Sequence, residues 1–153
     1  MAIRNIVKEG DEVLAKVCRP VTVFDDRLHT LVQDMKETLA KANGAGLAAP
    51  QVGVLKRLAL VVDDDDSVLV LINPVIVETE GEQCPTEGCL SVPGVWGKTR
   101  RPAKVTVEAV DENGKPVRYT RTGIVAVCFC HEIDHLDGHL YREHVTEYVL
   151  FDD

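Results

Sequence analysis

The strongest chemical signal in the sequence is a pair of histidines with a glutamate beside the first. His131, Glu132 and His135 form the pattern H-E-x-x-H. On a helix, residues i and i+4 lie on one face, so the two imidazoles can bind the same cation. Glu132 is turned about 100° from His131 around the helix, where a carboxylate can accept a proton from bound water. The pattern predicts a catalytic metal centre.

The alternative is an exposed helix that carries two histidines without a metal. The segment around the motif is mostly apolar, which indicates a buried helix, and its apolar residues are Ile124, Val125, Ala126, Val127, Phe129, Ile133 and Leu136. Two imidazoles and a carboxylate in such a helix need a partner, because burying polar groups without one is costly. The context therefore favours metal binding.

A catalytic metal site usually has three protein ligands and one open position, so a third ligand must be found. Tyr141 stands where many zinc peptidases have a third histidine, and His139 lies beyond the expected end of the helix. Cys128 shares a helix face with both histidines, but at a rise of about 1.5 Å per residue it lies too far along the axis. We interpret it as a pocket wall. Cys89 follows Gly88, which lets the backbone approach a ligand closely, but this motif is weak alone.

Hydrophobic periodicity indicates a first helix between an N-cap at Asp25 or Asp26 and a stop at Asn43. Its apolar positions follow a helical period: Leu28, Leu31, Val32, Met35 and Leu39.

The remaining chain reads as strands followed by a second helix. Strands are predicted at 58–62, 68–72, 75–77, 105–110 and 117–120, with a tight hairpin at 113–114 and a solvated acidic turn at 63–66. Residues 124–136 read as the buried helix, and 141–153 fit either a short helix or a strand. This order predicts an α+β fold in which mixed or antiparallel β-sheets surround a central buried helix that carries the H-E-x-x-H motif.

Composition limits the class of protein. The 153 residues suit a single domain spanning 1–153, and 45% hydrophobic with 27% charged residues is typical of a globular chain. A net charge of −8 argues against nucleic-acid binding and against docking on an anionic membrane. No secretory signal or spanning segment is visible, and the five cysteines are odd in number. We expect reduced thiols in a cytoplasmic protein, with the bacterial cytosol favoured, and a monomer.

Three segments are similar to the signature motifs of the peptide deformylase family, in the same order. They read GAGLAAPQ at 44–51, EGCLS at 87–91 and HEIDHL at 131–136. Their spacing and the chain length also resemble that family, so the likeness covers nearly the whole chain. Each segment alone is a weaker signal than the three together.

The resemblance implies a metal held by Cys89, His131 and His135, with water in the fourth position and Glu132 as general base and acid. The implied cofactor is one divalent ion, natively Fe²⁺, which Zn²⁺, Ni²⁺ or Co²⁺ can replace. The implied reaction removes the N-formyl group from N-formylmethionyl peptides of nascent proteins and releases formate. In it, metal-bound water attacks the formyl carbon.

The resemblance also implies residues that bind the substrate. The Gln51 side-chain amide and the Leu90 backbone N–H would stabilise the oxyanion. The substrate is a formylated peptide or nascent chain, with a transient ribosome contact. Further implied substrate-binding residues are Ala45, Gly46 and Gly88, through backbone pairing with an extended peptide, and Val127 and Cys128, in an apolar pocket for methionine.

Two positions depart from the family pattern, and two other functions stay open. Cys130 stands where the family usually has glutamine, and Trp96 where some members have arginine. Asp134 either orients a ligand histidine or pairs with Arg100 or Arg101. The competing functions are a metallopeptidase that cuts ordinary amide bonds and a non-catalytic metal-binding homologue.

Overall fold

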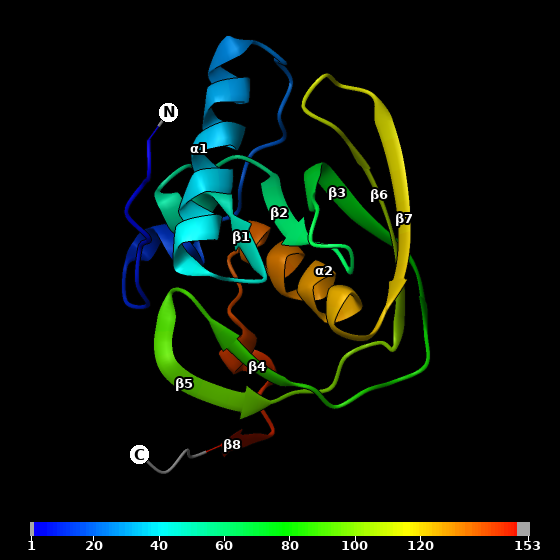
Figure 1. The fold of residues 1–153 in the computed structure, drawn as a ribbon. Helices are drawn as coiled ribbons and strands as arrows, with labels where there is room; N and C mark the ends of the chain where they lie inside the picture. The colour runs from blue at the N-terminus through cyan, green and yellow to red at the C-terminus, as the bar shows by residue number, and fades with distance from the viewer. Residues whose placement is uncertain (1, 150–153) are drawn as a thin grey trace.

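A computed structural model describes residues 2–149 as an α+β fold with two β-sheets and two α-helices. Helix α2 (Gly123–Leu136) lies in the middle, between the two sheets (Figure 1). The predicted central helix and α+β class are confirmed, and both sheets are antiparallel. Within residues 2–149, no helix is both long and apolar enough to span a membrane.

The larger sheet has five strands in the order β1-β2-β3-β6-β7. Its strands are β1 (Gly46–Ala48), β2 (Leu58–Val62), β3 (Val68–Glu80), β6 (Lys104–Val110) and β7 (Pro116–Thr122). The β2 strand has the predicted bounds, and a mostly exposed acidic turn joins it to β3, as expected. Strand β1 is an edge of this sheet and leaves one side unpaired within it.

The smaller sheet has the order β4-β5-β8 and lies on the other side of α2 (Figure 1). Its strands are β4 (Thr86–Cys89), β5 (Val92–Lys98) and β8 (Glu147–Val149). The C-terminal segment contains both of the conformations left open, a 3₁₀ helix at Tyr141–His144 and then β8. The rest of that segment, 150–153, lies outside the described residues.

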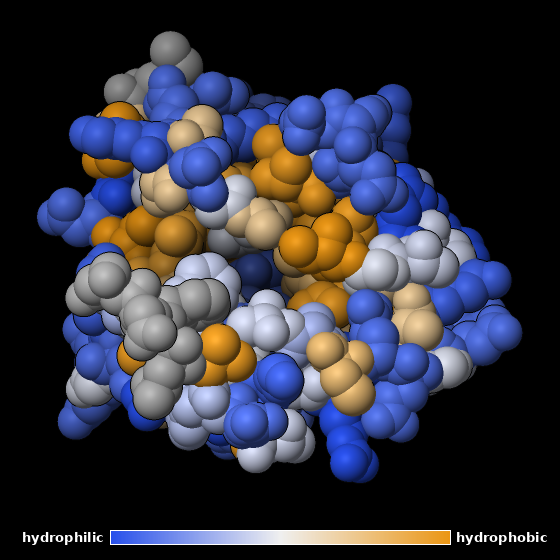
Figure 2. Space-filling view, turned by 60° about the horizontal axis from the view of Figure 1, so that its bottom comes forward, coloured by the Kyte–Doolittle hydropathy of each residue, from blue (hydrophilic) through white to orange (hydrophobic). Residues whose placement is uncertain are grey.

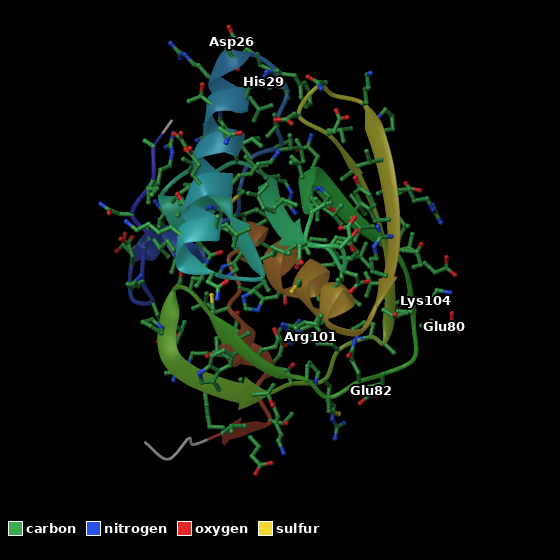
Figure 3. All side chains as sticks on the ribbon, in the orientation of Figure 1. Asp26, His29, Glu80, Glu82, Arg101 and Lys104 are labelled. Atoms are coloured by element: carbon green, nitrogen blue, oxygen red, sulfur yellow. The ribbon has the colours of Figure 1, made fainter. Side chains whose placement is uncertain are left out.

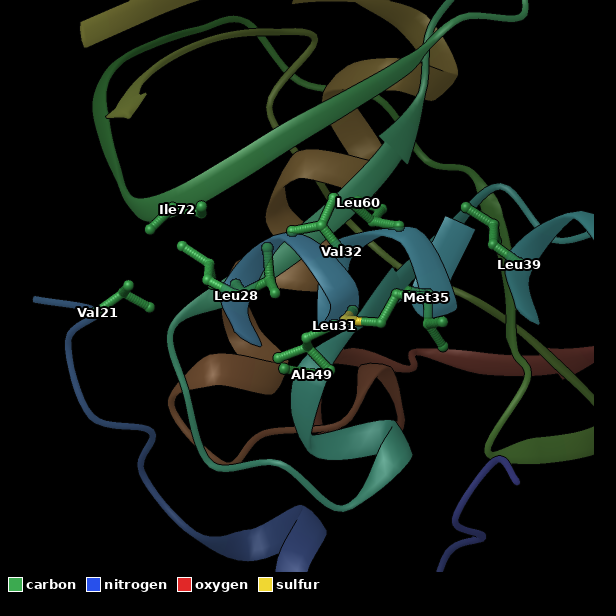
Figure 4. Close-up of a cluster of buried hydrophobic side chains, with 11 residues drawn as sticks. Val21, Leu28, Leu31, Val32, Met35, Leu39, Ala49, Leu60 and Ile72 are labelled. Atoms are coloured by element: carbon green, nitrogen blue, oxygen red, sulfur yellow. The ribbon is translucent and has the colours of Figure 1, made fainter. Parts of the chain in front are cut away.

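Helix α1 (Asp26–Ala42) confirms the first predicted helix. The Asp25 side chain accepts a hydrogen bond from the Leu28 N–H at 3.1 Å, and Asn43 ends the helix in the left-handed conformation. Its apolar face packs on the large sheet in a buried cluster (Figure 4) formed by Val21, Leu28, Leu31, Val32, Met35, Leu39, Leu47, Ala49, Leu58, Leu60 and Ile72.

Helix α2 is buried because it is apolar on most of its surface, as in helices enclosed by a core. It packs on the inner face of the large sheet together with buried residues of β2, β3 and β6. Cys130, which departs from the family pattern, belongs to this second buried cluster. The sheet therefore holds the helix, and with it the motif histidines, in a fixed position.

Two predicted strands are one strand in the structure. The segments 68–72 and 75–77 both belong to β3, which carries a register shift between Ile72 and Val75. Pro74 has no N–H to donate, so the strand accommodates it with an irregularity. Asn73, at a φ of 52°, accepts a bond from the Val21 N–H and donates to the Val21 carbonyl, at 2.8 and 2.9 Å. This contact ties the N-terminal segment to the sheet.

Candidate active site

Three side chains that can bind a metal meet between the small sheet and α2. Cys89 ends β4, and His131 and His135 lie one turn apart on α2. The Cys89 Sγ is 3.3 Å from His135 Nε2, and the two imidazole centroids are 5.1 Å apart. All three donor atoms lie within 4.8 Å of one another. Within residues 2–149, this is the group whose donors can share a metal ion.

The hydrogen bond of His131 and the burial of His135 suit metal binding. His131 Nδ1 donates to Glu87 Oε1 at 2.8 Å, which leaves Nε2 as the ring nitrogen available to an ion. Burial, together with His131, lowers the pKa of His135 to about 3, so its ring is neutral at pH 7. One cysteine sulfur and two imidazole nitrogens form a donor set that suits Fe²⁺, Zn²⁺ and similar ions. The residues present therefore fit the implied metal.

A buried ion-pair network contacts His131 at Nδ1, through Glu87. Glu87 accepts from Arg101 Nε at 2.7 Å and from the Thr99 hydroxyl. Burial disfavours the charge on Glu87, but the hydrogen bonds from His131 and Arg101 outweigh it and lower its pKa to about 2. Arg101 lies between α2 and the small sheet (Figure 3) and also donates to Asp134 at 2.9 Å. Asp134 therefore pairs with Arg101, one of the two roles left open.

Glu132 is buried beside the histidines, with one carboxylate oxygen, Oε1, that has no hydrogen-bond partner within the described residues. Burial raises its pKa to about 7, against the opposing effect of His131. Its other oxygen, Oε2, lies against β1, where a Cβ on Gly46 would be 2.5 Å away. A buried carboxyl group with a pKa near neutrality can accept and return a proton.

Gln51 lies on a 3₁₀ helix at Ala49–Val52, which contacts α2. Its Oε1 accepts from the Ala48 N–H at 2.9 Å, so its Nε2 must be the donor. This Nε2 donates to Ser91 Oγ at 3.0 Å and lies 3.5 Å from Cys89 Sγ. The amide therefore presents an N–H group close to the candidate metal ligand.

These groups lie around a cavity of about 500 Å³. Figure 2 shows a hollow on this side of the molecule, with hydrophobic side chains around a hydrophilic floor. The predicted site residues that line the cavity are Ala45, Gly46, Gln51, Gly88, Cys89, Leu90, Val127, Cys128, His131 and Glu132. His135 is fully buried beneath Cys89 and His131. The structure thus brings all the predicted site residues together, while their roles stay predictions.

The alternative third ligands have other positions. Tyr141 stacks on His131 with ring centroids 5.8 Å apart, and its hydroxyl donates to the Val95 carbonyl at 2.7 Å. His139 is at the surface, paired with Glu143. Burial is the main cause that raises the pKa of the Cys128 thiol to about 12, so it remains neutral in the cavity wall.

Three residues that contact the site had no role in the sequence analysis. They are Glu87, Ser91 and Tyr141, which contact His131, Gln51 and His131, respectively. Glu87 and Ser91 each lie two residues from Cys89 in EGCLS, so their position in the sequence could have indicated that they contact the site. Tyr141 reaches the site only through the turn that follows α2, which no local pattern indicates.

The fold and site define an α+β protein with a candidate Cys-His-His metal centre at the floor of a largely apolar cavity. Residues 3–149 match the family "Polypeptide deformylase". Peptide deformylase 2 of Clostridium acetobutylicum is 53% identical over 150 residues, covering 97% of this chain and 99% of that protein.

Solved structures agree with the sequence comparison. A peptide deformylase from Legionella pneumophila is 46% identical with a TM-score of 0.91, covering 95% of this chain and 87% of that one. Peptide deformylase from Thermotoga maritima is 35% identical with a TM-score of 0.92, covering 95% and 99%. The chain belongs to the polypeptide deformylase family and is an enzyme of that family.

Proposed function

We propose that this chain removes the formyl group from N-formylmethionyl peptides by hydrolysis, releasing formate and a free N-terminus. The observation that carries the proposal is the convergence of Cys89, His131 and His135 with Glu132 and Gln51 at one cavity. The first three supply ligands for an ion, and the other two supply a base and a hydrogen-bond donor.

Cys89, His131 and His135 would hold one divalent ion, for which we propose Fe²⁺, with Zn²⁺, Ni²⁺ or Co²⁺ as substitutes. Such an ion, when bound, lowers the pKa of water and polarises a carbonyl oxygen. The Glu87 carboxylate keeps His131 in the tautomer that leaves Nε2 free for the ion.

The remaining steps depend on groups of the chain itself. Glu132 accepts a proton from the attacking water at its carboxylate and then donates it to the leaving amine nitrogen. The Gln51 Nε2–H and the Leu90 backbone N–H donate to the oxyanion of the tetrahedral intermediate. Loss of one such donor typically costs a factor of about 10²–10³ in kcat, which is the effect expected of Gln51→Ala.

The sheet topology supports a peptide bound in extended form. β1 and β4 are both edge strands of their sheets, and Gly46 and Gly88 on these strands line the same cavity. Their backbones can pair with an added strand. Val127 and Cys128 form an apolar wall on the α2 side, suited to the methionine side chain.

We further propose that residues 1–153 act as a single catalytic domain, monomeric, in the bacterial cytosol, and that the substrate is the nascent chain near the ribosome. The site supports the single domain, since Gln51, Cys89 and His131 come from distant parts of the sequence.

The test uses protein purified without oxygen, because a thiolate ligand and Fe²⁺ are both oxidisable. The sample is incubated with formyl-Met-Ala-Ser and with unformylated Met-Ala-Ser, and formate and free amine are measured. We expect formate from the first peptide and no new amine from the second. Metal analysis of the same sample identifies the ion.

Two variants sharpen this test. Glu132→Ala that still carries its metal should lose nearly all activity, and activity equal to the parent would contradict the role of Glu132. Cys89→Ser that keeps both metal and activity would contradict the ligand set. Cleavage of the unformylated peptide would instead favour the metallopeptidase.

A further inference from the structure

Ser91 contacts Gln51 but takes no part in the steps above. It follows β4 in the turn to β5, and its side chain is fully buried. Its hydroxyl oxygen accepts the hydrogen bond from Gln51 Nε2 at 3.0 Å. Burying a hydroxyl group costs free energy unless a hydrogen bond compensates for it, as the bond from Gln51 does here.

The Ser91 hydroxyl limits the orientation of the Gln51 amide. The terminal torsion of glutamine is broad, so one contact does not define the plane of the amide. Here Oε1 is bound by the Ala48 N–H, and one N–H of Nε2 is directed to Ser91. The second N–H diverges from the first because the amide nitrogen is planar, and it is directed to Cys89 Sγ at 3.5 Å, the sulfur that would bind the ion.

The backbone holds Ser91 and Gln51 at this separation independently of the hydroxyl. The Val7 N–H donates to the Gln51 carbonyl at 2.6 Å, and the Glu9 N–H donates to the Ser91 carbonyl at 2.8 Å. One short N-terminal segment thus binds both residues, which are 40 positions apart. Ser91→Ala removes the hydroxyl and leaves these backbone bonds in place.

We propose that Ser91 is a positioning residue that orients the Gln51 amide toward the oxyanion. This inference rests on the proposed function, since Gln51 acts there as the donor. Ser91 itself does not touch the substrate. Removal of the Ser91 hydroxyl should therefore weaken the stabilisation of the transition state by Gln51. It should leave ground-state binding of the peptide largely unchanged.

A double-mutant cycle tests this role. Ser91→Ala should lower kcat about three- to tenfold, as expected for one neutral hydrogen bond, with KM within about twofold. In a Gln51→Ala background the same change should have almost no effect on kcat, because the residue that it orients is absent. The matched control is Thr106→Ala, which removes a buried hydroxyl bonded to Thr120 at 2.8 Å in the large sheet and should leave kcat unchanged.

A second readout does not depend on activity. In ¹⁵N-labelled protein, the side-chain amide signals of Gln51 are identified by their loss in Gln51→Ala. Ser91→Ala should shift these signals and speed their exchange with solvent, whereas Thr106→Ala should not.

Unshifted Gln51 amide signals in Ser91→Ala, or an equal loss of kcat with and without Gln51, would overturn the positioning role alone. Absence of formate from the parent protein would overturn the proposed function and this role with it.

Discussion

Gly46 has no space for a side chain, because the proposed base lies against it. A Cβ at this position would be 2.5 Å from Glu132 Oε2 and 2.9 Å from Glu132 Cδ, so the buried Glu132 side chain would have to shift. We expect Gly46→Ala to displace the carboxylate and to lower kcat about 10- to 100-fold, since small misplacements of catalytic groups have effects of this size. Steady-state kinetics on the formylated peptide measure the change.

The matched variant is Gly88→Ala, whose Cβ would have the Trp96 ring as its nearest contact, at 2.6 Å. Trp96 lines the same cavity, so this change should raise KM more than it lowers kcat. If Gly46→Ala kept both the kcat and the thermal stability of the parent protein, Glu132 would be able to move away from the added methyl group. That result would contradict the prediction.

His131 and Glu132 stand out in the sequence through the H-E-x-x-H motif, whereas Cys89 was assigned only through the resemblance to the family. The structure brings all three to one cavity. The sequence did not indicate Tyr141, because its stacking on His131 depends on the path of the chain after α2. It also left the partner of Asp134 undecided, since the choice of Arg101 follows from where the loop after β5 places that side chain.

The Glu87–Arg101 pair joins β4 to the loop after β5. Both side chains are almost completely buried. Glu87→Gln leaves a buried arginine without its carboxylate partner, so the free energy of unfolding should fall by about 3 kcal/mol or more. Urea denaturation in the presence of a chelator measures this without a contribution from bound metal.

The control for this prediction is Glu82→Gln. Glu82 and Arg100 form an ion pair of 3.8 Å in which both side chains are largely exposed. Exposed pairs contribute little, so the change should be within about 0.5 kcal/mol. Equal effects of the two variants would mean that the buried pair does not stabilise the fold.

The turn between β2 and β3 is tied to β7 by Asp63 and Arg121, which form two hydrogen bonds of 2.9 Å. The hydrogen bond from Arg121 lowers the pKa of Asp63 despite partial burial. A carboxyl group with a lower pKa in the folded state stabilises the protein above its unfolded pKa, and this contribution is lost as the pH falls through the folded value.

Asp63→Asn should therefore reduce the free energy of unfolding by about 1 kcal/mol at pH 7, and the difference from the parent should shrink below about pH 4. Urea denaturation at both pH values measures it. The control is Asp64→Asn, an exposed carboxylate in the same turn, which should have little effect at either pH. A difference for Asp63→Asn that grows in acid would contradict the assigned sign.

Helix α1 was predicted from its regular apolar period, and α2 and β2 from their mostly apolar sequences. Strands β4 and β5 were not assigned as elements, since Gly88, Pro93, Gly94 and Gly97 interrupt any strand pattern there. These strands exist through pairing with each other and with β8, which is distant in sequence. Local propensity contains no information on such pairing.

For the whole molecule, the α+β class followed from the order of periodic segments, whereas the division into two sheets did not. That division matters for function because the candidate metal site spans it. Cys89 belongs to the small sheet, and His131 and His135 belong to the helix that packs on the large sheet. A bound ion would thus link both halves of the molecule.

An ion that binds the folded chain at about 100 times its Kd stabilises it by about 2.7 kcal/mol. For a chain of this size, that corresponds to a melting temperature higher by about 5–10 °C. Chelation of protein loaded with Zn²⁺ should lower the Tm by this amount, as measured by circular dichroism. In Cys89→Ala, which lacks the ligand from the small sheet, the same treatment should have a much smaller effect, because the two remaining histidines lie on one helix. An equal loss of Tm in both proteins would place the stabilising ion elsewhere and would contradict the link between the sheets.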